Sequence, residues 1–418
     1  MAAVSLLAAC GGRDDEPSTS AGNDSGGGNV EPSPGITDSE VTLGGIYPLS
    51  GPASAYGTIG AAVQGCLKYV NEQGGVEMGD GKTRTIKFVV EDDGYAPDRA
   101  VAAAKKLVEQ DQVFALFNTL GTPSNTAIWD YTNQQKTPQF FVATGAGKWG
   151  ADVDTHPWTV GWQLPYPTES AIYASWLGEN HPDAKVAVLF QNDDYGKDYL
   201  DAFKTAIEGS NITIVDEQSY EVTDPTVDSQ VTNLSGTDAD VFFNITTPKF
   251  AAQAIKKAGE LGWNPVQLLN SVSASVTSVI EPAGFENAQN IVTSTYIKDP
   301  SDPQWADDEA MTEYKGLIEK YTDVDPNNSF GVYGFAVCES MVKVLEQTEA
   351  PTREALMDAI RNMDGIEIGL LLPGVTLTTS GSEDGYPIES GQVSKFVEDR
   401  FELQGDPISF EGKTPKAK

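Results

Sequence analysis

Short apolar runs alternate with amphipathic segments along most of the chain. The first run, Val41–Tyr47, predicts a strand that ends at Gly51-Pro52. Beyond it, apolar side chains recur at three- and four-residue steps on one face of a predicted helix: Ile59, Val63, Cys66 and Val70. Gly74-Gly75 ends this helix. The loop between strand and helix, Ser50–Gly57, offers free backbone N–H groups to an anionic or carbonyl group, although an ordinary connection has the same pattern.

The same alternation continues in two series. Further strands are predicted at residues 85–91, 113–117, 138–143, 185–190, 213–220, 239–245, 266–269 and 291–297. Further helices are predicted at residues 97–110, 169–177, 249–261, 302–320, 333–346 and 352–362, with two more that end at Tyr131 and begin at Asp194. We interpret residues 158–163 as a connector and residues 376–403 as extended pieces and turns. The pattern predicts an α/β fold with two doubly wound parallel sheets.

The length of the chain, 418 residues, predicts two domains rather than one. The helices after residue 302 can complete the first domain, and the final strand can rejoin the second. The chain would then cross between the domains several times, and the crossings would form a hinge.

The amino end differs from the rest. Residues 4–12, VSLLAACGG, resemble a bacterial lipobox, in which Cys10 carries the lipid. The basic segment and the longer apolar core of a signal peptide are missing, so either the true start lies upstream or the match is accidental. Because a tether follows, we interpret residues 1–10 as the remnant of a lipoprotein signal. Residues 11–37 are rich in Gly, Ser, Pro and acids and predict a flexible tether. A lipid on Cys10 would anchor the protein without a spanning helix, and the chain has no run of about 20 apolar residues.

Acidic residues outnumber basic ones by 61 to 27, which gives a net charge of −34 spread along the chain. This charge argues against nucleic acid or an anionic membrane surface as a partner. Two cysteines remain besides Cys10. In a protein outside the cytoplasm, Cys66 and Cys338 could form one disulfide, and two separate buried thiols are the alternative.

Enzyme signatures are scarce. The two histidines, His156 and His181, each lie in a polar turn beside proline, so a catalytic triad or zinc site is poorly supplied. Residues 145–150 fit G-x-G-x-x-G but follow the fourth strand without opening a clear helix. The acid pairs Asp92-Asp93 and Asp193-Asp194 could hold a metal, but their places before helices favour capping. We expect no enzyme activity, no cofactor and no metal.

Several loops combine small residues with isolated aromatic rings. All of them follow predicted strands, and they come from both series: Ser50–Gly57 with Tyr56, Asn118–Thr122, Thr144–Gly147, Asp194–Gly196 with Tyr195, and Thr246-Thr247. Each loop alone reads as a plain turn. Together, their hydroxyls, amides and rings favour a cleft for a noncovalently bound small molecule.

These segments resemble the substrate-binding proteins of ABC importers in the branched-chain amino acid (Leu/Ile/Val-binding) class. The resemblance covers residues 38–405. It is carried by Pro48–Pro52 with Tyr56-Gly57, Asn71–Gly75, Asp92-Asp93 with Pro97, Thr137–Ala146, Tyr195-Gly196, and Asp240–Pro248 followed by the helix at residues 251–262. The lipobox and tether are similar to those of a Gram-positive member, in which the lipid replaces a periplasm as the means of retention.

The resemblance implies a two-lobed, type I periplasmic-binding-protein fold with three hinge crossings. One lobe would hold residues 38–160 and 297–390, and the other residues 161–296 and 391–418. The resemblance implies ligand contacts at Tyr56, at Asn118, Thr119, Leu120 and Gly121, at Thr144, Gly145, Ala146 and Gly147, at Tyr195, and at Thr246 and Thr247. The loop from Asn118 to Gly121 would hold the carboxylate of the ligand.

One departure from the family concerns the ammonium group of an amino acid. The family usually has an acid after the strand that corresponds to Val266–Leu269, but here the loop is NSVSAS, with Ser271 and Ser273 as candidate contacts. A buried ammonium without a partner is costly. Either another acid such as Asp193 or Asp194 serves, or the ligand has no α-amine. Lys148 could pair with a carboxylate, so we favour a small organic acid or amide, aromatic ones included, over a branched-chain amino acid.

We therefore expect an extracytoplasmic protein, lipid-anchored to the outer face of a bacterial membrane. As a monomer, it would capture a small solute and deliver it to the permease and ATPase complex of an ABC importer. The alternative is a ligand-sensing receptor lobe for a signalling partner.

Overall fold

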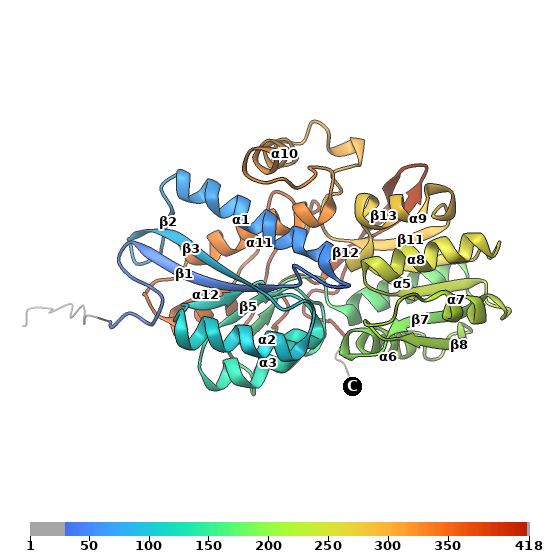
Figure 1. The fold of residues 1–418 in the computed structure, drawn as a ribbon, viewed down its shortest axis with the longest axis horizontal. Coiled ribbons are helices and arrows are strands. Elements are labelled where there is room, and N and C mark those ends of the chain that lie inside the picture. Colours follow the sequence, from blue (N-terminus) through green and yellow to red (C-terminus); the bar gives the residue numbers. More distant parts are fainter. Residues whose placement is uncertain (1–29, 416–418) are drawn as a thin grey trace, which may run out of the picture. The chain divides into compact units, whose positions relative to one another are not determined.

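Two sheets, each with a core of parallel strands, form the framework of the computed structural model, which describes residues 30–415 (Figure 1). The first sheet has the strand order β2-β3-β1-β4-β5-β6, and the second has the order β13-β12-β11-β10-β9-β7-β8. The expected α/β fold with two parallel-sheet lobes is confirmed. We call each sheet with its covering helices a lobe. The expected lipidation site Cys10 and most of the expected tether lie outside the described residues.

The strands of the first sheet are β1 (Glu40–Tyr47), β2 (Val76–Glu77), β3 (Thr83–Asp92), β4 (Ala115–Phe117), β5 (Gln139–Val142) and β6 (Thr159–Gly161). Only the β2–β3 pair is antiparallel. The prediction of a connector at residues 158–163 was wrong, because β6 pairs there with β5. With three residues, β6 is too short to show the alternation of apolar and polar side chains that identifies a strand.

The strands of the second sheet are β7 (Lys185–Gln191), β8 (Thr213–Tyr220), β9 (Val241–Ile245), β10 (Val266–Leu269), β11 (Ile291–Thr295), β12 (Ser390–Val397) and β13 (Arg400–Ser409). Strands β7 to β11 pair in parallel, and β12 and β13 form an antiparallel hairpin that pairs with β11. The chain therefore passes from the first sheet to the second after β6, leaves it after β11 and returns at β12.

Helices cover both faces of each sheet. The helices are α1 (Gly57–Glu72), α2 (Pro97–Lys105), α3 (Thr122–Gln134), α4 (Lys148–Ala151), α5 (Tyr166–Asn180), α6 (Asp194–Ala206), α7 (Asp228–Ser235), α8 (Pro248–Glu260), α9 (Glu281–Ala283), α10 (Glu309–Tyr321), α11 (Ser329–Glu346) and α12 (Arg353–Arg361). The predicted helix at residues 302–320 begins later than expected, because Asp308 caps α10 through the Met311 N–H.

Side-chain alternation along β1 explains the layers of the first lobe. Val41, Leu43 and Tyr47 point into the core beneath α1 and α11, whereas Ile46 packs with α2 and α3 on the other face (Figure 1). In the second lobe, α5 and α6 cover one face of the sheet, and α7, α8 and α9 cover the other. Among residues 30–415, no helix is both long and apolar enough to cross a bilayer.

A disulfide joins two helices of the first lobe. Cys66 of α1 and Cys338 of α11 are bonded, although 272 residues separate them in sequence. The structure thus selects one of the two alternatives that the sequence left open. The bond links the amino-terminal part of the lobe to the part that the chain adds after its return from the second sheet.

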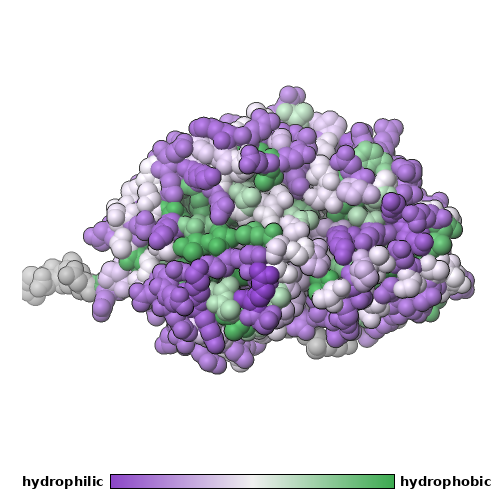
Figure 2. All heavy atoms as spheres, in the orientation of Figure 1, coloured by the Kyte–Doolittle hydropathy of each residue, from purple (hydrophilic) through white to green (hydrophobic). Residues whose placement is uncertain are grey.

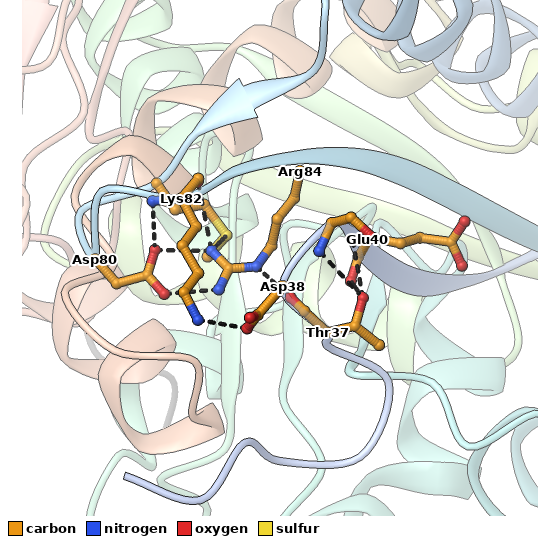
Figure 3. A network of polar contacts seen from close by, with 8 residues as sticks. Thr37, Asp38, Glu40, Asp80, Lys82 and Arg84 are labelled. Carbon is orange, nitrogen blue, oxygen red and sulfur yellow. Dashed lines mark hydrogen bonds and ion pairs between the residues drawn. The ribbon is translucent and has the colours of Figure 1, made fainter. Parts of the chain in front are cut away.

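A buried ion pair fixes the segment that leads into β1 (Figure 3). The Arg84 guanidinium is fully buried and donates to both carboxylate oxygens of Asp80, at 2.8 and 2.6 Å, and to the Thr37 carbonyl oxygen. The hydrogen bonds from Arg84 lower the pKa of Asp80. Beside it, the ion pair between Lys82 and Asp38 is exposed. The visible face of the protein is mainly hydrophilic, in keeping with its high charge (Figure 2).

We expect Arg84→Ala to lower the free energy of unfolding by about 3 kcal/mol, because it leaves the Asp80 carboxylate partly buried without its partner. Lys82→Ala, which removes the exposed pair of the same network, should cost at most about 1 kcal/mol. Urea unfolding of both variants gives the two values. Equal losses would contradict the assignment of Arg84 as the group that holds this segment.

Candidate ligand-binding site

The carboxyl ends of strands from both sheets meet at one cavity. Six of the fifteen residues predicted as ligand contacts line it: Tyr56, Leu120 and Gly121 from the first lobe, and Tyr195, Thr247 and Ser271 from the second. Loops that follow parallel strands gather at one edge of a sheet, so two such edges that face each other enclose the cavity.

The other nine predicted contacts lie outside the described cavity wall: Asn118, Thr119, Thr144, Gly145, Ala146, Gly147, Lys148, Thr246 and Ser273. Several of them hold the loops in shape instead. Asn118 donates to the Phe141 carbonyl oxygen at 2.8 Å, and Ser273 donates to the Thr246 carbonyl oxygen at 2.5 Å. Asn118 and Ser273 thus act on the cavity by positioning the loops that line it.

The amino end of α3 contributes to the wall of the cavity in the first lobe. Gly121 precedes the helix with φ of +95°, and an added Cβ would lie 2.5 Å from the Tyr95 ring. A glycine is therefore required at this position. In this helix Pro123 carries no N–H and the Gly121 N–H donates to the Ala143 carbonyl oxygen, so the N–H groups of Thr122 and Ser124 remain without partners within the helix, and the helix dipole favours negative charge there. This end of the cavity suits a carboxylate or carbonyl oxygen.

Aromatic rings form much of the remaining wall. The Tyr56 ring packs on Phe330 with centroids 5.3 Å apart, and its hydroxyl donates to the Val272 carbonyl oxygen of the other lobe at 3.1 Å. Burial raises the pKa of Tyr56 and of Tyr195 well above the ordinary value, so both phenols are neutral donors. The Tyr195 hydroxyl has no hydrogen-bond partner within residues 30–415. It is a polar group on the cavity wall that a ligand can satisfy.

Glu169 of α5 organises the wall of the second lobe. Its fully buried carboxylate accepts from the Ser271 N–H at 2.7 Å, from the Ser271 hydroxyl at 2.5 Å and from the Tyr199 hydroxyl at 2.9 Å. The Tyr173 hydroxyl lies 2.6 Å away. Burial raises the pKa of Glu169, and the hydrogen bonds from Ser271 act in the opposite direction. Glu169 thus fixes the loop after β10 through its hydrogen bonds with Ser271.

Two further contacts hold the lobes together beside the cavity. The Lys148 ammonium lies 3.0 Å from the Asp194 carboxylate, and the hydrogen bond from Lys148 contributes to lowering the pKa of Asp194 against the effect of burial. The Gly147 N–H donates to the Asp198 carboxylate at 3.0 Å. Asp193 caps α6 through the N–H groups of Tyr195 and Gly196, as the sequence predicted. Lys148 and both acids of the Asp193-Asp194 pair are thus engaged with the protein itself.

Neither histidine lies on the described cavity wall. The His156 ring stacks on Trp129 with centroids 3.7 Å apart, and its two nitrogens face Asp152 and Asp130. The cavity therefore presents hydroxyls, backbone amides and rings, which suit noncovalent binding.

Sequence reasoning missed part of the wall. The additional residues include Tyr95, Gln163, Tyr166, Tyr296 and Tyr333, and the acids Asp299 and Asp302 also line the cavity. Tyr296, Asp299 and Asp302 belong to the segment after β11, where the sequence predicts a strand that ends at Ile297 and a helix that begins at Asp302. These residues could have been predicted from the topology, because the chain leaves the second lobe after β11 and a crossing segment passes beside the cavity.

We expect Glu169→Ala to lower the free energy of unfolding by about 3–5 kcal/mol, because it opens a cavity and leaves buried donors of Ser271 and Tyr199 without a partner. Glu169→Gln should cost clearly less, since its amide oxygen can still accept from the Ser271 N–H and the hydroxyls can turn. Urea unfolding measures both. A loss in Glu169→Gln as large as that in Glu169→Ala would show that the negative charge itself is required.

Comparison with known proteins agrees with this architecture. The family model described as periplasmic binding protein matches residues 40–397. The Leu/Ile/Val-binding protein BraC3 of Rhizobium johnstonii is 23% identical over 381 residues, which cover 86% of this chain and 94% of that protein. The Leu/Ile/Val-binding protein homolog 3 of Brucella melitensis is 28% identical over 208 residues, which cover 49% of this chain and 54% of that protein.

Solved structures share the fold. A fatty acid ABC transporter substrate-binding protein from Thermomonospora curvata superposes with a TM-score of 0.78 at 23% identity, over 93% of this chain and 97% of that chain. A branched-chain amino acid ABC transporter protein from Thermus thermophilus with bound valine gives a TM-score of 0.78 at 17% identity, over 90 and 97% of the two chains. The chain belongs to the periplasmic binding protein family, as an extracytoplasmic, non-enzymatic substrate-binding protein of the Leu/Ile/Val-binding class that serves ABC transport.

Proposed function

We propose that this protein captures a small organic solute (an organic acid, an amide or an amino acid) between its lobes and delivers it to the permease of an ABC importer. The observation that carries the proposal is the cavity at the strand ends, whose wall contains residues of both lobes. A ligand that touches both lobes favours the closed arrangement over the open one, and only such differential affinity can drive closure. The three chain crossings serve as the hinge.

The chemistry of the cavity supports a preference within that class. The amino end of α3 suits a carboxylate or amide oxygen, and the tyrosines suit an apolar or aromatic body. An α-ammonium would lie next to that carboxylate. The described loop after β10 offers it no acid, and Glu169, the acid behind this loop, is already hydrogen-bonded to Ser271 and Tyr199. We therefore favour an acid or amide without an α-amine.

Two names among the relatives fit the carboxylate and the apolar body, although valine also carries an α-amine. The Thermus thermophilus protein holds valine, and the Thermomonospora curvata protein is named for fatty acids. Both ligands combine a carboxylate with an apolar body. We propose that the protein works as a monomer, anchored through a lipid on Cys10, with lobes of residues 38–160 with 297–390 and 161–296 with 391–418.

The test is native mass spectrometry of the purified protein before and after denaturing extraction, followed by calorimetry with the extracted compound. We expect one small carboxylate or amide per chain, which rebinds to the emptied protein. A reconstituted permease and ATPase complex should then import that compound only when the protein is present. Binding without any import would favour the sensor alternative, and turnover of the compound would contradict a binding function.

The pH dependence of affinity tests the contact between Asp198 and Gly147. Burial raises the pKa of Asp198 to about 6. Opening returns this carboxyl to water, where its ordinary pKa is about 3.9. The closed form therefore holds the proton more tightly, and closure becomes less favourable as the pH rises from about 4 to about 6.

We expect the protein to bind its extracted ligand more tightly at about pH 5 than at about pH 7.5, as measured by calorimetry. This difference should shrink in Asp198→Asn. It should persist in Glu179→Gln, which alters an exposed acid of α5 in the same lobe. The same pH dependence in Asp198→Asn as in the unaltered protein would contradict the role of this contact.

A further inference from the structure

The cavity crosses the second sheet from strand to strand. Six strands that are neighbours in this sheet, or the loops that follow them, each supply wall residues: Tyr195 after β7, Thr247 after β9, Ser271 after β10, Thr293 of β11, Ser394 of β12 and Leu403 of β13. We call these six the wall strands. Neighbouring strands lie about 4.8 Å apart, so the five spacings from β7 to β13 span about 24 Å. An extended chain advances about 1.2 Å per bond, so the carbon skeleton of leucine spans only about 5 Å.

The amino end of α3 lies at the β7 end of the wall strands. The Thr126 hydroxyl of α3 lies 3.2 Å from the carboxylate of Asp194, which opens the helix after β7. Gly121, at the start of α3, is five residues before Thr126, a distance of about 7 Å along the helix axis. Tyr56 lies further along the wall strands, because its hydroxyl donates to the Val272 carbonyl oxygen after β10. The place that suits a carboxylate is thus at one end of the cavity, and the β12–β13 hairpin is at the other.

The hairpin end of the cavity combines two apolar side chains with one unpartnered hydroxyl. Phe401 and Leu403 share a face of β13, because side chains alternate along a strand. Ser394 pairs with Thr293 on one side and with Leu403 on the other, so these three side chains also share a face. Ser394 is only 1% exposed, and its hydroxyl has no hydrogen-bond partner within residues 30–415. Buried hydroxyls are rarely left unsatisfied, so this one points to a bound molecule that reaches β12.

The two acids of the crossing segment are engaged in their own turns. Asp299 accepts from the Ser301 N–H at 2.8 Å, and Asp302 accepts from the Gln304 N–H at 2.9 Å. Burial raises the pKa of Asp299, and the charge of Lys315 acts in the opposite direction. Because the protein itself supplies these partners, we assign neither acid to a group of the ligand.

We propose that the natural ligand is elongated: an acid or amide whose polar head lies at the amino end of α3 and whose unbranched apolar chain follows the wall strands to the β12–β13 hairpin. The inference rests on the proposed function, because it names the ligand class of the same cavity. The four spacings from β7 to β12 span about 19 Å, and a chain of about ten to fourteen carbons covers most of this distance. Leu403, at the end of the cavity, limits the length that fits.

A series of chain lengths tests the inference. Calorimetry of the full protein, emptied by denaturing extraction and refolded, would compare unbranched carboxylates of about four to fourteen carbons. We expect the affinity to rise about tenfold for every two added carbons, up to at least about ten carbons, because each buried methylene contributes. An affinity that peaks at about four to six carbons, or a short co-purified ligand, would overturn the inference and still support solute capture. Binding of no acid or amide at all would contradict both.

A variant at the hairpin tests where the chain ends. Leu403→Trp fills the β13 end of the cavity, so it should lower the affinity for the twelve-carbon acid about tenfold and leave that for the six-carbon acid unchanged. Leu261→Trp makes the same substitution at an exposed leucine away from the cavity wall, and it should change neither affinity. Equal losses for the long and the short acid in Leu403→Trp would contradict this path of the chain.

The Ser394 hydroxyl provides a second test of position. Among acids with a terminal hydroxyl, the one that reaches β12 should bind about fivefold more tightly than the methyl-ended acid of the same length, the scale of one hydrogen bond. Ser394→Ala should remove this gain and leave the affinity for methyl-ended acids unchanged. The inference is overturned if a terminal hydroxyl gives no gain at any length, or if the gain persists in Ser394→Ala.

Discussion

Parallel pairing of the central strands decides where the loops of this protein can lie. A parallel neighbour requires a crossover connection, which here is a helix in nearly every case, so the carboxyl ends of β1, β3, β4 and β5 come out at one edge of the first sheet. The same holds for β7 to β11 in the second sheet. The cavity and the contacts between the lobes both follow from these two edges.

The loops at these edges are irregular backbone, and they keep their shape through buried polar groups. Partial burial acts to raise the pKa of Asp92, but hydrogen bonds from Ser50, Gly94 and Arg99 prevail and lower it to about 2. This carboxylate holds the Ser50 loop of the first lobe, as Glu169 holds the loop after β10 in the second. Each lobe thus uses a carboxylate behind or beside a loop to keep its part of the cavity wall in place.

Much of the fold could be predicted from the sequence, because apolar alternation and helical spacing are local signals. Strand β10 was predicted with its observed bounds, and Asp193 was predicted as a cap. The cavity wall was predicted less completely. The sequence predicted correctly which loops form the cavity, but which side chain of a loop faces inward depends on packing. In the loop after β9, Thr247 lines the cavity, whereas the Thr246 hydroxyl donates to the Asn244 side chain. Asp299 and Asp302 lie in a crossing segment, where no periodic pattern marks the side that meets the ligand.

The disulfide in the first lobe has a mechanical consequence for the cavity. Helix α1 begins directly after Tyr56, and α11 begins directly before Phe330, the ring on which Tyr56 packs. Because Cys66 and Cys338 tie these two helices together, the aromatic pair forms one stiff unit. In the proposed capture of a solute, the first lobe would then keep the shape of its part of the cavity wall while the second lobe moves. To change the ligand selectivity, one would therefore keep the disulfide-linked first lobe unaltered and vary the side chains of the second lobe that line the cavity.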